Sequence, residues 1–398
     1  MSSPIDLTED PEDNLPPNIL EDWLPIRNKS VFHLFSFNHY PVYKTRYLVP
    51  PDLGPVLHEE EVPDFDHTTL LQLGLPVDTS ILDVYQAAIK STQHMVHSVT
   101  LRPYPGLGEP ITLPVWIFDY WREIESAAEY WKKWKVALKW LRSYLAFPAT
   151  ASCCQELLMA LSFFPWSGNN TSVKHITSLL SSSNPQSYLH SFHVDHMIGH
   201  ISTQYHELHG PEVSRRHIFM TVDTLGEIAK SYSSSGVSTK TRDALQKRLM
   251  EIENQIVKGE VDSVSGVYHL PLHWVSIVID VQQGHILYGD SLKKSMPRLE
   301  RNAFTKWIRR LYRRSNRSAD SVSVHPLATG YQDDVTSCGL FVLNAISHHH
   351  LGHPLLSPNQ VSVALMQIEI ALDLVHENTV CLTFDNMLYF YLMCTIDC

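Results

Sequence analysis

The sequence lacks any apolar run that approaches the ~18 residues of a membrane-spanning helix. Its N-terminal residues also lack both the basic and the apolar part of a secretory signal peptide. These absences argue against a membrane protein and against export. We therefore expect a nuclear or cytoplasmic protein that is not secreted.

Cysteine is scarce, with six residues in a chain of 398. No two of them form a C-x-x-C pair, and adjacent cysteines such as Cys153 and Cys154 do not bridge each other easily. The sequence therefore excludes a disulfide scaffold and a Cys-rich zinc module. The net charge of −11 disfavours bulk nucleic-acid binding, although a local basic patch would still be able to act.

Histidines at helical spacing raise the question of a metal site. His193, His196 and His200 fall on one face of a helix that the pattern predicts over 188–205. The H-E-x-x-H pattern of helical zinc sites is absent, and a histidine-rich polar face is the preferred interpretation. The run 348–350 is interpreted in the same way. We expect neither a metal nor another cofactor.

Three regions differ in composition. Residues 1–30 predict a disordered tail, because seven Asp or Glu face two Lys or Arg and aliphatic residues are few. Residues 31–145 predict a helix-rich accessory region, with Pro114 at the start of a long helix. The aromatic stripe of that helix, which includes Trp121, is interpreted as a core face rather than a cofactor wall or a base-stacking surface. Residues 146–398 carry the most regular strands and the candidates for chemistry.

Two strands in the third region predict a hairpin. The apolar run 274–280 has the character of a buried strand, and residues 285–290 return after a Gln-Gln-Gly turn. His273 stands just before the first strand and Asp290 ends the second, so the hairpin should bring them together. Alone, each is more simply a strand-end histidine or a turn-forming aspartate. As a pair on one rigid edge, they favour a base and the carboxylate that orients it.

A single cysteine stands where a polar loop changes to an apolar helical pattern. Thr336 and Ser337 are available as N-caps, which places Cys338 in the first turn of a helix. The helix dipole there favours the thiolate, which is the nucleophile, and the free N–H groups are donors for an oxyanion. Gln332, in the preceding loop, would add an amide donor. A buried, inert thiol is the alternative for the cysteine taken alone.

One combined pattern resembles the ubiquitin-like-protein-specific protease family, the SUMO proteases: His273-Trp274, then Asp290, Gln332 and Cys338-Gly339, in that family's order and spacing. The resemblance covers about 188–398, and the N-terminal part is similar to fungal members, some of them encoded by mobile elements. It implies an α+β fold of the papain-like, adenain-like type, in which helices flank a central mixed sheet.

The resemblance also assigns roles to residues. It implies that Cys338 is the nucleophile and His273 the base. Asp290 would be the carboxylate that orients the base, and Gln332 the oxyanion donor. Trp274 and Tyr188 would wall a narrow channel that admits a Gly-Gly tail. The family usually has Trp-Leu before an acid-containing helix start, and this chain has Tyr188-Leu189-His190-Ser191 instead. The departure concerns the substrate channel and not the chemistry.

The implied function is cleavage after the C-terminal Gly-Gly of SUMO or a related modifier, in deconjugation, precursor maturation or both. Two alternatives stay open: a catalytically degenerate module that binds a ubiquitin-like protein, and a mobile-element accessory protein that acts on nucleic acid. Electrophilic modifiers and DNA-binding assays would separate the three.

Two surface segments have further interpretations. The stretch from Ile5 to Asp10 resembles a SUMO-interacting motif, in which Ile5 and Leu7 would contact SUMO by strand addition. A plain acidic tail is the alternative. The basic stretch 298–317 is interpreted as a solvated helix face, a nuclear localisation signal, or a contact surface for an acidic partner or DNA.

Overall fold

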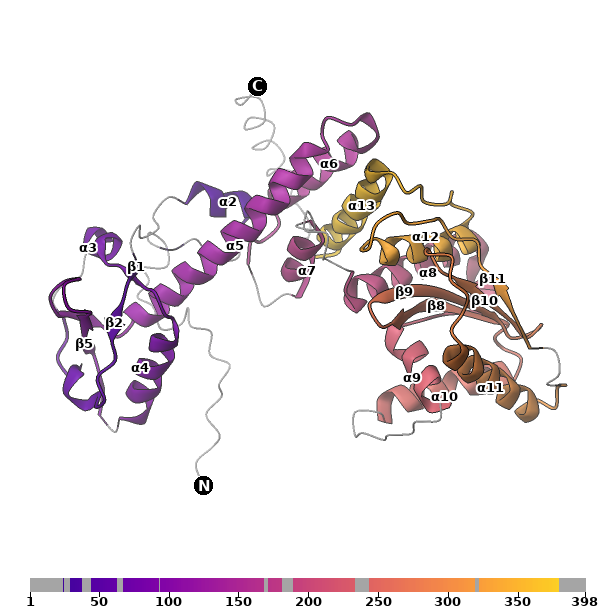
Figure 1. Ribbon diagram of the computed structural model, residues 1–398, viewed down its shortest axis with the longest axis horizontal. Helices are drawn as coiled ribbons and strands as arrows, with labels where there is room; N and C mark the ends of the chain where they lie inside the picture. The colour runs from indigo at the N-terminus through magenta and orange to yellow at the C-terminus, as the bar shows by residue number, and fades with distance from the viewer. Residues whose placement is uncertain are drawn as a thin grey trace. The chain divides into compact units, whose positions relative to one another are not determined.

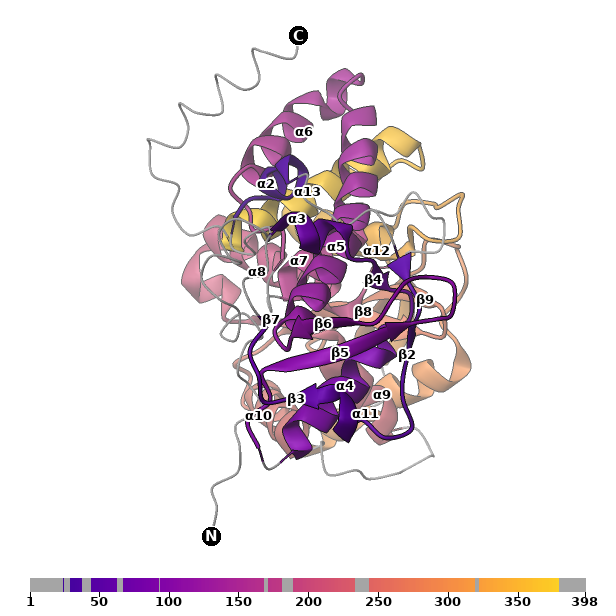
Figure 2. The same ribbon diagram turned by 90° about the vertical axis from the view of Figure 1, so that its left-hand side faces the viewer.

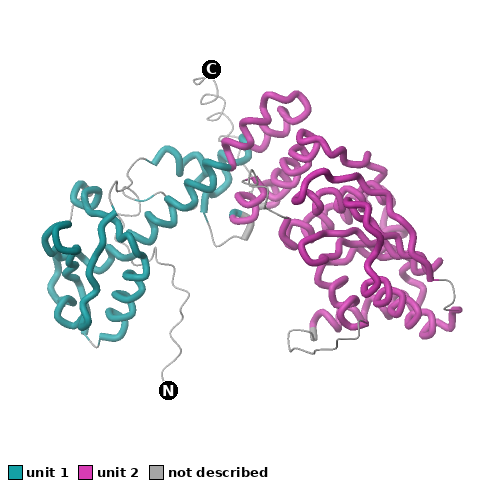
Figure 3. The backbone as a smooth tube through the Cα atoms, viewed as in Figure 1, with its two compact units in different colours: residues 1–136, 158–173, 378–398 teal, residues 137–157, 174–377 magenta. Residues whose placement is uncertain are grey.

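The structure is a computed structural model that describes residues 24, 29–37, 44–62, 67–92, 94–167, 171–180, 189–232, 243–318 and 322–378. The chain divides into two compact units, shown in Figure 3: residues 1–136, 158–173 and 378–398 form the first, and residues 137–157 and 174–377 form the second. No described helix has the length and apolar character needed to span a bilayer. Ile5, Leu7 and Tyr188 lie outside the described residues, and the predicted domain boundaries stay predictions.

The first unit is built on a small antiparallel sheet with β5 (Ser98–Pro103) at its centre, as Figure 2 shows. Its partners are β2 (Tyr47–Leu48), β3 (Leu57–His58) and β6 (Ile111–Pro114). A separate parallel pair joins β1 (Lys44–Thr45) and β4 (Leu75–Pro76). The short helices of this unit are α2 (Val31–Ser36), η2 (Gly54–Val56), α3 (His67–Gln72) and α4 (Ser80–Ser91).

Helix α5 (Ile117–Ser143) starts later than the sequence predicts. Pro114 does not begin the helix, because it ends β6, where it pairs with Ser98. A proline fits the end of a strand as well as the first turn of a helix, so its local preference did not decide between them. The interpretation of the aromatic stripe as a core face is confirmed for Trp121 and Trp134, which are fully buried.

The second unit contains a five-stranded mixed sheet in the order β11-β10-β9-β8-β7. The central strands run antiparallel and each edge strand pairs in parallel, so the predicted α+β class with a central mixed sheet is confirmed. Six consecutive residues of β9 are buried, which fits a strand covered on both faces. The strands are β7 (His217–Met220), β8 (Ser263–Leu270), β9 (His273–Asp280), β10 (His285–Gly289) and β11 (Ser323–Pro326).

Helices cover both faces of this sheet (Figure 1). On one face lie α9 (Val222–Tyr232), α10 (Asp243–Val257) and α11 (Arg298–Arg314). On the other face α12 (Cys338–Leu351) packs against β9, with α8 (Ser191–Ser214) beside it. The other helices among the described residues are α6 (Pro148–Leu161), α7 (Thr171–Leu180) and α13 (Gln360–Asn378).

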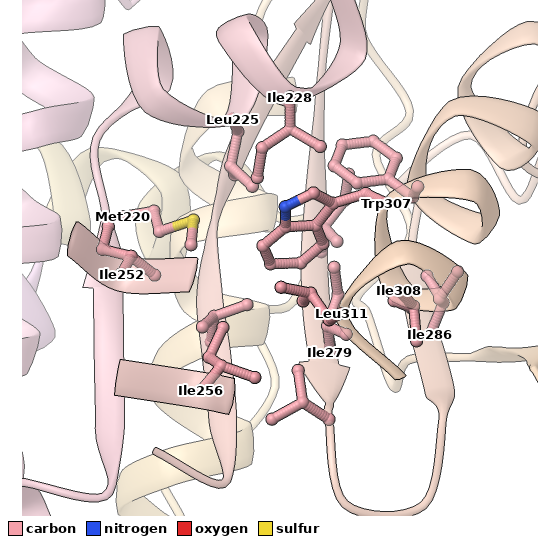
Figure 4. Close-up of a cluster of buried hydrophobic side chains, with 14 of the residues drawn as sticks. Met220, Leu225, Ile228, Ile252, Ile256, Ile279, Ile286, Trp307, Ile308 and Leu311 are labelled. Carbon is pink, nitrogen blue, oxygen red and sulfur yellow. The ribbon is translucent and has the colours of Figure 1, made fainter. Parts of the chain in front are cut away.

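The apolar core beneath the sheet is centred on Trp307 of α11 (Figure 4). Leu225 and Ile228 reach it from α9, and Ile279 and Ile286 reach it from the two strands of the hairpin. All five side chains are almost completely buried. Because β9 and β10 each contribute to one close-packed cluster, their relative register is fixed, and so are the residues at their ends.

A buried carboxylate joins α10 to α11. Glu253 is 3% exposed and accepts hydrogen bonds from Trp307 Nε1 at 3.1 Å and from the Tyr232 hydroxyl at 3.0 Å. Arg314 Nη1 lies 2.7 Å from its other oxygen and is the cation of this cluster. The neighbouring Arg313 is exposed as well and points about 100° away around the helix. Part of the basic stretch 298–317 therefore serves the fold, and its other interpretations stay predictions.

We expect Arg314→Met to lower the free energy of unfolding by about 3 kcal/mol, because it leaves the buried Glu253 carboxylate without its cation. Arg313→Met is the matched control and should change stability by less than about 0.5 kcal/mol. Urea unfolding of both variants measures the difference. Equal midpoints for the two variants would contradict a stabilising ion pair at Glu253.

Candidate active site

The β9–β10 hairpin brings the two predicted partners together. Ser276 of β9 pairs with Gly289 of β10, so Asp290, the next residue, lies near the start of β9. His273 is the first residue of that strand, and its Nε2 lies 2.9 Å from Asp290 Oδ1. The predicted proximity of this histidine and this carboxylate is confirmed. The buried faces of both strands determine the register between β9 and β10.

Each member of this pair stabilises the charged form of the other. Burial by itself raises the pKa of the Asp290 carboxyl, but hydrogen bonds from His273 and from the Leu292 N–H outweigh burial and leave this pKa below its usual range. The hydrogen bond to Asp290, followed by one to Cys338, raises the pKa of His273 to about 9 against the effect of burial. The imidazole therefore holds its proton at neutral pH.

Cys338 is the first residue of α12 and is 1% exposed. Its thiol is near enough to the His273 side chain to help raise the pKa of that imidazole. Because Nε2 of that histidine faces Asp290, Nδ1 is the nitrogen that faces the sulfur. Among the described residues, none accepts a hydrogen bond from the Cys338 N–H, as expected for the first turn of a helix. The predicted helix start is confirmed.

The capping of this helix differs from the prediction. Ser337 is the N-cap residue, but its hydroxyl does not cap the helix and instead donates to Asp334. The Asp334 carboxylate also accepts the backbone N–H groups of Thr336 and Ser337, both at 2.8 Å. A carboxylate three residues earlier thus holds the loop, because its two charged oxygens accept more donors, and bind them more strongly, than a single hydroxyl does.

Gln332 is 2% exposed and lies in the loop before α12. The Ser291 hydroxyl donates to its side-chain oxygen, which orients the amide. One N–H of the amide donates to the Asp334 carbonyl at 2.8 Å. An amide nitrogen carries two hydrogens, so the second N–H is left to meet another acceptor. Ser291 and Asp334 both support this geometry.

Trp274 and Leu189 form a wall beside Cys338. The Trp274 indole N–H donates to the Leu189 carbonyl at 3.1 Å, and Trp274 is 4% exposed. Leu189 packs onto Gly339, the residue after Cys338, so closely that an added Cβ would lie 2.9 Å from the leucine side chain. A hollow of about 620 Å³ opens beyond this wall, between Leu189, Trp274 and the start of α9.

Two supporting residues were missed at the sequence level. Ser291 follows Asp290 directly, yet nothing local indicates that its hydroxyl would meet Gln332 across 41 positions of sequence. The Asp334 carbonyl receives the Gln332 amide, a contact that the loop sequence does not indicate. The signal for Ser291 is a polar side chain that is buried with a defined partner, and burial is a tertiary property.

The histidine clusters form side-chain contacts of their own. His193, for example, is buried, and its Nε2 lies 3.1 Å from the His175 carbonyl. Within the described part of the chain, no group of three or more His, Cys, Asp or Glu side chains is arranged to hold a metal ion.

The chain is similar to known proteases. Residues 219–376 match the model of the C-terminal catalytic domain of the Ulp1 protease family. No curated protein matches the chain. The match to the family model confirms the resemblance predicted from the His, Asp, Gln and Cys pattern.

Solved structures with a similar arrangement include the C-terminal Ulp1 protease domain in complex with Smt3, the yeast ortholog of SUMO, at 16% identity over 52% of this chain and 84% of that chain, with a TM-score of 0.37. The catalytic domain of the Chaetomium thermophilum Ulp1-like SUMO protease is 15% identical, over 50% and 78%, with a TM-score of 0.39. The Xanthomonas campestris effector XopD, bound to ubiquitin, is 16% identical, over 48% and 90%, with a TM-score of 0.30.

The family match covers the hairpin, Gln332 and the helix that begins at Cys338. Residues 219–376 are therefore similar to the catalytic domain of the Ulp1 protease family, whose members are cysteine peptidases.

Proposed function

We propose that the protein hydrolyses the bond after the C-terminal Gly-Gly of SUMO or a related ubiquitin-like modifier, and so releases it from lysines or matures its precursor. One observation carries the proposal: Asp290 holds His273 at 2.9 Å, and the Cys338 thiol is near enough to that histidine to help raise the pKa of its imidazole. Thiol proteases need a nucleophile, a base and an orienting group in this arrangement. The family match supports the same chemistry.

The substrate class is supported by how little room surrounds the thiol. Cys338 is 1% exposed, and Leu189 and Trp274 stand beside it. A chain with bulky side chains next to the scissile bond would clash with this wall. An extended tail that ends in two glycines has no side chains there and meets the steric requirement.

In the proposed acylation step, the Cys338 sulfur attacks the carbonyl carbon of the terminal glycine. The backbone N–H of Cys338 and the free amide N–H of Gln332 stabilise the oxyanion. His273 Nδ1 carries the thiol proton and transfers it to the leaving amine as the C–N bond breaks. The products of this step are the free amine and a thioester between the modifier and Cys338.

Hydrolysis of the thioester restores the enzyme. His273, now neutral, takes a proton from a water molecule as its oxygen attacks the thioester carbonyl. The C–S bond breaks, the thiolate leaves and the imidazolium is regenerated. Asp290 keeps Nδ1 directed at the reacting atoms in both steps and stabilises the charge on the ring.

The test is a panel of SUMO, ubiquitin and related modifiers that carry an electrophile in place of the C-terminal glycine carboxylate. We expect SUMO or a close relative to form a covalent adduct with the full chain, mapped to Cys338 by peptide mass spectrometry. Binding without an adduct would favour the degenerate binding module. No reaction and no binding with any modifier would overturn the proposed substrate class.

Gln332→Ala should lower kcat/KM for a modifier conjugate by about 10²- to 10³-fold, mainly through kcat, because it removes one oxyanion donor. Ser291→Ala keeps the amide but loses the hydroxyl that orients it, so a smaller loss of about tenfold is expected. Steady-state kinetics of both variants measure the effects. A Gln332→Ala enzyme within threefold of the native rate would exclude the oxyanion role.

Two outlying features belong to the same proposal. Ile5 and Leu7 would provide a second contact with the modifier, and deleting residues 1–10 should then weaken binding without changing kcat. We also propose a nuclear or cytoplasmic location, which a fluorescent fusion would test directly.

A further inference from the structure

A second hollow, of about 600 Å³, lies beside His273. His273, Asp290 and Gln332 line it, and so do the exposed side chains of Leu299 and Val335. The wall formed by Leu189 and Trp274 belongs to the first hollow and not to this one. His273 lines the second hollow and not the first, and a volume of about 600 Å³ lies within the usual range of ligand pockets.

Three exposed aliphatic side chains line this second hollow beside the polar Lys294, Ser295 and Asp334, and one of the three, Leu272, also lines the first hollow. Leu272 is 79% exposed, and Leu299 and Val335 are each 71% exposed. They come from three separate segments: the β8–β9 turn, the first turn of α11 and the loop before α12. Single exposed apolar residues are common, but three that converge on one hollow mark a contact surface.

The backbone of Leu272 strengthens this interpretation. Leu270 pairs with His273, so only Pro271 and Leu272 form the turn between β8 and β9. Leu272 has a φ of 58°, in the left-handed region where glycine or asparagine is favoured. Neither burial nor turn preference accounts for a leucine here. A strained residue beside reactive groups points to a functional contact.

We propose that this hollow binds the leaving-group side of the substrate, namely the extended segment of the conjugated protein around the acceptor lysine, with an aliphatic residue next to that lysine. The inference rests on the proposed function, which places the modifier tail on the Trp274 side of Cys338. The leaving amine must meet His273 to receive its proton, and the polypeptide that carries it continues into the space beyond. Leu299 and Val335 provide the apolar surface that its neighbouring side chain would cover.

The test compares two isopeptide conjugates of the modifier that reacts fastest in the electrophile panel. The acceptor peptides differ only in the residue before the lysine, which is leucine in one and serine in the other. We expect the native enzyme to cleave the leucine conjugate with about tenfold higher kcat/KM, the usual effect of one buried aliphatic contact. The double variant Leu299→Asn, Val335→Asn should reduce this preference to less than twofold.

Leu208→Asn is the matched control, because Leu208 is 62% exposed and lines neither hollow. It should keep the tenfold preference. The preference is a ratio measured on each enzyme, so a general loss of active protein does not alter it. Adduct formation with the electrophilic modifier involves no acceptor peptide and tests the proposed function separately. A native enzyme that forms the adduct but shows no leucine preference, or a double variant that keeps the preference, would overturn this inference alone.

Discussion

Cys338→Ser should reduce turnover of a modifier conjugate by about 10⁶-fold, the loss seen when the nucleophile of such a triad is removed. A serine hydroxyl keeps nearly the same shape, but it does not form the anion that a thiol forms beside an imidazolium. The packing of α12 should survive the change, because residue 338 is buried and the two side chains are similar in size. Substrate binding should therefore stay close to native, which fluorescence anisotropy with a labelled modifier measures alongside single-turnover cleavage.

Cys153→Ser is the control for this experiment. Cys153 is a partly exposed free thiol in α6 and has no place in the proposed chemistry. Its replacement should leave both turnover and adduct formation unchanged. A Cys338→Ser enzyme with substantial activity, or a Cys153→Ser enzyme without it, would show that the nucleophile is assigned wrongly.

Asp290→Ala should lower kcat/KM by about 10⁴-fold, because His273 loses both the acceptor that orients its ring and the charge that favours the imidazolium. Asp290→Asn separates these two effects. An asparagine oxygen can still accept from His273 Nε2 and from the Leu292 N–H, and only the negative charge is lost. We expect the Asn variant to be more active than the Ala variant and less active than the native enzyme. Equal rates for the Asn and native enzymes would assign the carboxylate an orienting role only.

The pH dependence follows from the same pair. The pKa of His273 is raised to about 9, so kcat/KM should fall as pH rises through about 9, where the imidazolium that protonates the leaving amine is lost. In Asp290→Asn the principal cause of the raised pKa is weakened, and this alkaline limb should move to lower pH. An unchanged limb would indicate that it belongs to another group.

The free energy of unfolding also depends on pH through His273 and Asp290. A raised histidine pKa stabilises the fold fully below the ordinary value of about 6.5, and this contribution is lost as pH rises through about 9. The pKa of Asp290 is lowered, so its contribution is present above about 4 and is lost on acidification. The pair therefore stabilises the protein most between about pH 4 and 6.5, well below the alkaline limb expected for kcat/KM.

The sequence predicted the position of a site residue wherever that residue lies at the end of a regular helix or strand. The apolar run of β9 and the turn after it predicted the hairpin, and the hairpin predicted that His273 meets Asp290. The change from polar loop to apolar helix predicted the position of Cys338. In each case the hydrophobic pattern predicted the secondary-structure element, and the end of that element gave the position of the functional residue.

Prediction failed where two local preferences were equally satisfied or where a contact was purely tertiary. Pro114 fits a strand end or a helix start, and its pairing with Ser98 decided the matter. Ser291 reads as an ordinary turn residue until Gln332 is placed against it. Hydrophobic patterning does not predict the exposed Leu272 in the β8–β9 turn, because a two-residue turn with a positive φ favours glycine or asparagine at that position.

The contact between Leu189 and Gly339 limits how this enzyme can be re-engineered. Because any Cβ at position 339 would meet the leucine side chain at 2.9 Å, the two positions cannot be varied independently. A library that varies only Leu189 to widen the channel for the modifier tail therefore leaves out the substitutions at Gly339 that a smaller residue at 189 would allow. Broader substrate acceptance is reached most directly by shortening Leu189 while keeping the glycine, and a side chain at 339 becomes tolerable only in variants that already carry a smaller residue at 189.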